Sequence, residues 1–72
     1  MNRIKELRER LNLTLEALSE KTKTEAGDGQ GLSIGYLSHL ENGSRDNPSK
    51  DTMERVSKAL DRTVSEVFFP DH

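Results

Sequence analysis

The chain has no cysteine and no tryptophan, and its 72 residues include only one Tyr and two Phe. The absence of cysteine excludes disulfides and thiolate metal sites and is typical of a reducing compartment, so we expect a cytoplasmic location. No apolar run approaches the roughly 18 residues of a membrane span, and we expect no signal peptide and no membrane partner. A hydrophobic fraction of 31% against a charged fraction of 33% predicts one small domain, residues 1–72, with a thin core.

A surplus of positive charge is also missing. The formal net charge is -2, whereas DNA-binding domains usually gain affinity from extra Lys and Arg. The basic residues gather in residues 1–23 and just after Gly43, where a phosphate backbone would be expected to run. The charge therefore permits DNA binding without arguing strongly for it.

Catalytic and metal-binding patterns are absent from the sequence. The two histidines, His39 and His72, lie far apart, and no nucleophile motif surrounds any Ser, His or Asp. We therefore expect no enzyme and no cofactor or metal. His39 is better interpreted as a polar residue that faces DNA or a protein partner.

Apolar spacing predicts helices throughout and no strand. In the first helix Ile4, Leu7 and Leu11 recur on one face, with Asn2 as its cap. A second helix is expected over residues 15–22. The sequence thus predicts an all-α fold.

The third helix is marked at both ends. Ser33 can cap its N-terminus, and Gly43 supplies the left-handed residue that closes many helices. Leu37 and Leu40 point to one side, and small polar residues point to the other. This pattern indicates a helix anchored on the core with its outer face free to contact a ligand.

Two further helices complete the predicted set of five. Ser49 caps the fourth, and Thr63 with Glu66 makes a capping box for the fifth. Phe68 is expected in the core, which leaves Phe69 exposed. Phe69 therefore indicates a homodimer or other protein contact, or mere local packing, and the sequence leaves these alternatives open.

Seven short motifs in this order resemble the Cro/CI (XRE-type) helix-turn-helix family over nearly the whole chain. They are Ile4 to Arg8, Leu13-Thr14, Leu18 to Thr22, Tyr36 to Ser38, Leu40 to Gly43, Asn47 to Ser49, and Lys58 to Leu60. The resemblance implies a five-helix domain and a sequence-specific DNA-binding regulator at the operator of a phage or mobile-element genetic switch.

The resemblance also implies roles for individual residues. It places four residues at base edges in the major groove: Ile34, Gly35, Ser38 and His39. It places four more at phosphates: Tyr36, Asn42, Ser44 and Arg45. It joins Arg8 to Glu41 in an ion pair that fixes orientation more than it adds stability.

Three departures from the family pattern favour a different partner. Leu15 stands where the family has a glutamine that touches the DNA backbone, and Gly35 offers nothing to a base edge, although Ile34 could touch a thymine methyl. The turn between the second and third helices is lengthened to residues 23–32. This acidic, glycine-rich segment predicts either a plain surface loop or a contact for a protein.

An antirepressor is accordingly the alternative function. The chain is similar in size and in these departures to the small modulator-of-repression proteins of temperate phages. Such a protein would grip a repressor of similar fold through the helix-turn-helix surface and have weak DNA affinity of its own. The candidate interface residues are Leu15, Glu25, Asp28, Ile34 and Phe69.

Overall fold

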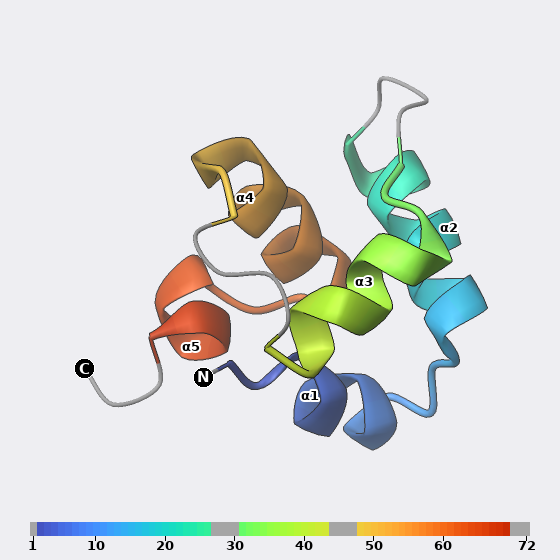
Figure 1. Ribbon diagram of the computed structural model, residues 1–72, viewed down its shortest axis with the longest axis horizontal. Helices are drawn as coiled ribbons and strands as arrows, with labels where there is room; N and C mark the ends of the chain where they lie inside the picture. Colours follow the sequence, from blue (N-terminus) through green and yellow to red (C-terminus); the bar gives the residue numbers. More distant parts are fainter. Residues whose placement is uncertain (1, 27–30, 44–47, 70–72) are drawn as a thin grey trace.

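The computed structural model describes residues 2–26, 31–43 and 48–69, and these form five helices and no strand. The all-α, five-helix fold predicted from the sequence is confirmed (Figure 1). In chain order the helices are α1 (Ile4–Arg10), α2 (Leu15–Ala26), α3 (Ile34–Glu41), α4 (Lys50–Ala59) and α5 (Val64–Phe68).

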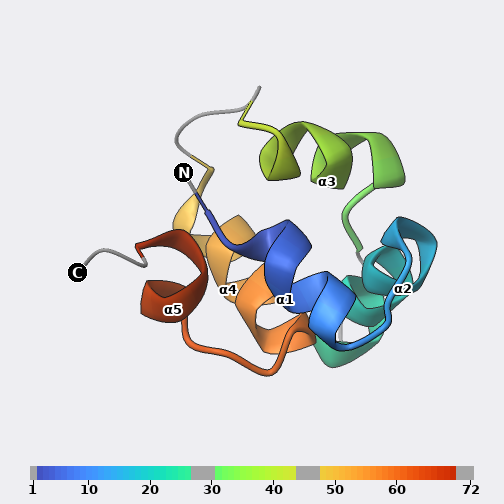
Figure 2. The same cartoon turned by 90° about the horizontal axis from the view of Figure 1, so that it is seen from below.

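The core is a single cluster to which every helix contributes. Helix α2 packs along α4, α3 rests on α1 and α2, and α5 packs against α4 and α1 (Figures 1 and 2). Because α3 stands at the edge of this bundle, one side of it stays open. The buried apolar side chains are Ile4, Leu7, Leu18, Leu37, Leu40, Val56, Ala59, Leu60 and Val67.

Three helices are each followed, within two residues, by a residue with positive φ. Gly43 follows α3 with φ 80°, and Asn12 and Asp61 follow α1 and α4 with φ 58° each. After Asn12 the reversal lets the Leu13 N–H donate to the Arg8 carbonyl oxygen at 3.0 Å, which closes the end of α1. Glycine adopts this conformation at no steric cost, and Asn and Asp tolerate it.

Two predictions about α1 need correction. Leu11 was expected on the core face, but α1 ends at Arg10, so Leu11 turns outward and is 46% exposed. The N-cap position belongs to Arg3, whose side chain makes no capping bond. Asn2 nevertheless supplies the missing acceptor, because its Oδ1 accepts from the Ile4 N–H at 3.1 Å.

The short helix α5 is held by the predicted capping box. The Glu66 N–H donates to the Thr63 hydroxyl oxygen, and the Thr63 N–H donates to Glu66 Oε1, both at 3.1 Å. The Arg3 N–H also donates to the Val67 carbonyl oxygen at 2.8 Å, which ties α5 to the start of α1. Phe69, directly after α5, is 47% exposed.

The capping box makes the stability of α5 depend on pH. Hydrogen bonds from the Thr63 N–H and then its hydroxyl lower the pKa of Glu66. A carboxylate whose pKa is lower in the folded state stabilises the fold above its ordinary pKa, and this contribution is lost as pH falls through the folded-state pKa. We expect Glu66→Gln, which keeps an acceptor but cannot titrate, to reduce the fall in unfolding free energy between about pH 6 and pH 3.

The measurement is urea unfolding followed by circular dichroism at each pH. Some pH dependence must persist in the variant, because the hydrogen bond from Arg3 also lowers the pKa of Glu6. Identical pH profiles for the variant and the wild type would contradict a role for Glu66 ionisation.

Candidate nucleic-acid interface

Helix α3 presents an open outer face of mixed chemistry. Ile34, at its first position, is 44% exposed; Gly35 and His39 are exposed, and Ser38 is half-buried. The helix start is fixed because the Ser33 hydroxyl accepts from the Tyr36 N–H at 3.1 Å. The four residues predicted to face bases therefore all belong to α3, and none of them is in the buried core.

The C-terminal end of α3 is held by an ion pair. Arg8 Nε lies 2.8 Å from Glu41 Oε2, and Arg8 Nη2 lies 3.2 Å from Oε1, in a two-point contact. Arg8 Nη1 donates to the Leu13 carbonyl oxygen at 2.7 Å. The two charged side chains are only 14% and 8% exposed, so this pair is largely shielded from water.

Asn2 makes a second tie to the same end of α3. Its Nδ2 donates to the Leu40 carbonyl oxygen at 2.7 Å while its Oδ1 accepts from the Ile4 N–H. One amide therefore joins the start of α1 to the last turn of α3. Sequence reasoning found only the local half of this arrangement, because the Leu40 carbonyl lies 38 residues away and no sequence pattern marks it.

The N-terminal end of α3 is tied to α2 through Leu32. The Leu32 N–H donates to the Thr22 hydroxyl oxygen at 3.0 Å, and the Ser19 hydroxyl donates to the Leu32 carbonyl oxygen at 2.5 Å. The Thr22 hydroxyl in turn donates to the Ser19 carbonyl oxygen at 2.6 Å, and Thr22 is fully buried. A side chain at Gly31 would lie 2.9 Å from Lys23 Cβ, so this close approach requires glycine.

These ties correct the predicted turn between helices 2 and 3. The sequence places the helix end at Thr22 and a loop at residues 23–32, but α2 continues to Ala26 and Leu32 is bound to α2. Three of the four added helical residues are polar and the fourth is Ala26, so they carry no apolar spacing that could have revealed them. Residues 27–30, including Asp28, lie outside the described part of the chain.

The remaining predicted site residues lie in different places. Asn42 is exposed at the C-cap of α3, whereas Tyr36 is half-buried and packs against the core. Leu15 is also half-buried against the core, which leaves only part of its side chain for a partner. Glu25 belongs to the last turn of α2. Ser44 and Arg45 lie outside the described residues.

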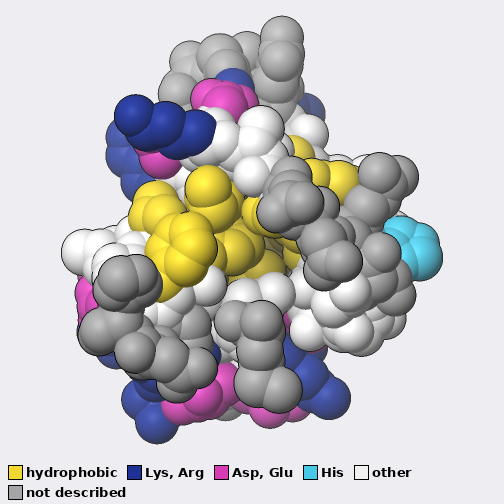
Figure 3. Space-filling model, turned by 60° about the vertical axis from the view of Figure 1, so that its left-hand side comes forward, with side chains coloured by type: hydrophobic (Ala, Val, Ile, Leu, Met, Phe, Trp, Pro, Cys, Tyr) yellow, Lys and Arg dark blue, Asp and Glu magenta, His cyan; other side chains and the backbone are white. Residues whose placement is uncertain are grey.

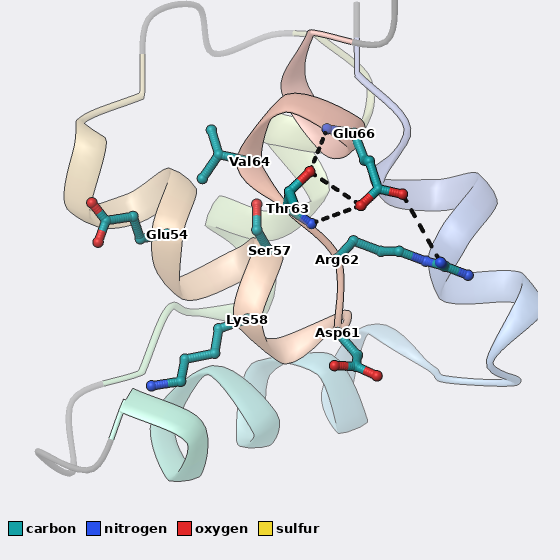
Figure 4. Close-up of a pocket in the computed structure, with 8 residues that line it drawn as sticks. All are labelled: Glu54, Ser57, Lys58, Asp61, Arg62, Thr63, Val64 and Glu66. Carbon is teal, nitrogen blue, oxygen red and sulfur yellow. Dashed lines mark hydrogen bonds and ion pairs between the residues drawn. The ribbon is translucent and has the colours of Figure 1, made fainter.

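A separate hollow of about 400 Å³ lies between α4 and the start of α5, and it includes no residue of α3 (Figure 4). Both signs of charge line it, from Glu54 and Asp61 to Lys58 and Arg62. Ser57 borders it and is 2% exposed, and its Oγ has no hydrogen-bond partner among the described residues. Within those same residues, no three His, Asp or Glu side chains lie where they could hold a metal ion.

The comparison with protein families decides the assignment. A helix-turn-helix family model matches residues 4–67, from the start of α1 almost to the end of α5. The chain belongs to the Cro/CI-like (XRE-type) helix-turn-helix family. Comparison with curated proteins found no match, and neither did comparison with solved structures.

Members of the Cro/CI-like family are DNA-binding transcription regulators, and the match supports this function for the chain. None of the helices in the described ranges is long and apolar enough to span a membrane. The hydrogen bonds through Leu32 set the position of α3 relative to α2.

Two buried hydroxyls test how α3 is positioned. Thr22→Val leaves the Leu32 N–H without its acceptor, so we expect a loss of about 1–3 kcal/mol in unfolding free energy. Ser57→Ala is the matched control, because it removes a buried hydroxyl that has no partner in the described chain, and we expect no loss. Urea unfolding measures both. Equal destabilisation by the two variants would contradict the proposed tie.

Proposed function

We propose that this protein is a sequence-specific regulator that binds an operator in a phage or mobile-element genetic switch. The observation that carries the proposal is the placement of α3, which polar ties hold at both ends while its outer face stays open. An α-helix with its side chains is about 10–12 Å in diameter, which fits the major groove of B-DNA, about 12 Å wide.

The proposed contacts follow the outer face of α3. Ser38 and His39 have groups that can donate or accept hydrogen bonds, so they are the candidates for polar base edges. Ile34 and Gly35 face the same groove one turn earlier. Tyr36, Asn42, Ser44 and Arg45 are proposed at phosphates, where they would set register without reading sequence.

The proposal predicts that substitutions at base-facing and at phosphate-contacting residues affect DNA binding in different ways. His39→Ala should change which duplexes are preferred, because it removes a base-facing group. Arg45→Ala should weaken binding to all duplexes alike and reduce the salt slope by about one, because one phosphate contact is lost. The measurement is selection from a randomised duplex library, followed by anisotropy titrations at several salt concentrations.

Lys58→Ala is the matched charge control. Lys58 is an exposed cation on α4 beside the hollow, away from α3, so its removal should leave the salt slope almost unchanged. If His39→Ala and Arg45→Ala, like the control, bind the selected duplexes with wild-type affinity and preference, α3 and its flank are not the DNA-binding surface.

An antirepressor is the second candidate function, and two observations favour it. The net charge is -2, and the exposed Ile34 on α3 is an apolar side chain of the kind that fills the centre of a protein interface. A repressor with a basic DNA-binding face would be complementary to this chain, and binding there would block the operator. Glu25, Asp28 and part of Leu15 would border that contact.

Phe69 offers a further apolar contact beyond α5. Figure 3 shows hydrophobic side chains gathered on the face that carries α4 and α5, bordered by charged groups. Phe69 is 47% exposed, and Val64 and Phe68 are half-buried. We propose Phe69 as a contact with a second copy of the chain or with the repressor.

The antirepressor hypothesis is tested by adding this protein to the repressor of the same genetic element and measuring operator occupancy. We expect occupancy to fall, and Ile34→Asp to restore it. Leu11→Asp is the control, because Leu11 is similarly exposed at 46% but follows α1. Tight operator binding by this chain alone, with no complex to the repressor, would return the assignment to an ordinary DNA-binding regulator.

A further inference from the structure

The first turn of α3 combines an exposed apolar side chain with a bare backbone. Ile34 is one of three large hydrophobic residues that are exposed in the described chain, and the other two, Leu11 and Phe69, lie outside α3. An exposed isoleucine gains free energy when a ligand covers it with apolar surface. When α3 binds DNA, Ile34 therefore favours a position next to an apolar group of the DNA.

The polar side chain next to Ile34, and the acidic one at the far end of α3, hold the ends of the helix. The Ser33 hydroxyl accepts the Tyr36 N–H as the helix cap, and at the far end Glu41 is paired with Arg8. The base-facing polar side chains, Ser38 and His39, follow one turn later. The first turn of α3 therefore meets a ligand through contact and shape rather than through side-chain hydrogen bonds.

Gly35 removes the obstacle to close contact. A Cβ built at this position would meet no atom within 4 Å, so nothing in the fold requires glycine there. Glycine inside a helix also lowers helix stability relative to alanine. The missing side chain leaves the backbone of the first turn open, so a surface can approach Ile34 without being held away by its neighbour.

We propose that Ile34 recognises the 5-methyl group of a thymine, with Gly35 allowing α3 to lie close to that base. The thymine methyl is the apolar group on the base edges that line the major groove. This inference rests on the proposed DNA-binding function and adds the chemical group that the first turn of α3 reads. The operator then carries a thymine opposite Ile34.

The test replaces each thymine of a selected duplex by deoxyuridine. The duplex is the one that the wild-type protein recovers from a randomised library. Deoxyuridine keeps the base pair and the O4 acceptor but lacks the methyl group. At the thymine that lies opposite Ile34 we expect affinity to fall about fourfold, the equivalent of one buried methyl-sized contact. The same replacement at other thymines should have no effect.

The protein-side variants complete a double-mutant cycle. Ile34→Ala should weaken binding to the thymine duplex and bind the thymine and uracil duplexes equally, because the contact is already lost. Leu11→Ala, at a similarly exposed apolar residue outside α3, should keep the fourfold difference. Gly35→Ala should raise the thermal midpoint of the protein while lowering its affinity for the selected duplex.

The outcomes separate this inference from the proposed function. If duplexes are recovered but no deoxyuridine replacement lowers affinity, or if Ile34→Ala keeps the wild-type difference, the thymine contact is wrong and DNA binding stands. If the library yields no enriched duplex at low salt, DNA recognition itself fails and the inference fails with it.

Discussion

The arrangement of this small protein depends on one guanidinium group. Arg8 contacts both carboxylate oxygens of Glu41 and also the Leu13 carbonyl, so it joins α1, the end of α3 and the link into α2. Lysine could not make this fork of contacts, because its ammonium is a single point charge. Since the pair is largely shielded from water, loss of either partner would leave a desolvated charge, which makes the geometry strongly preferred.

Polar contacts at both ends of α3 fix its orientation, a role that a larger apolar core would have in a larger protein. α3 contributes only Leu37 and Leu40 to the buried cluster. Burial is non-directional, so two leucines would leave the tilt of α3 poorly defined. Hydrogen bonds have preferred directions, and those of Asn2 at one end and Leu32 at the other define it. An open outer face can then be kept without a flexible helix.

The sequence predicts most of the fold, because caps and apolar spacing are local signals. Ser33 and the Thr63–Glu66 box act as their residue types suggest, and Gly43 ends α3. The sequence fails where tertiary contacts decide. Leu11 fits the helical spacing but lies past the last turn, and the buried Thr22 hydroxyl accepts from the N–H of Leu32, ten residues on. At the site, the α3 residues follow from family resemblance, whereas the ties that hold α3 have no sequence signal.

The tie between Leu32 and α2 separates chain length from helix placement. The chain leaves α2 at Ala26 and is bound to α2 again by Leu32, directly before the helix cap of α3. Residues inserted between Ala26 and Gly31 leave the Leu32 hydrogen bonds and Gly31 unchanged, and the entropy of closing a longer connection rises only slowly with its length. We therefore expect peptides, affinity tags or fluorophores inserted between Ala26 and Gly31 to leave α3 in its place.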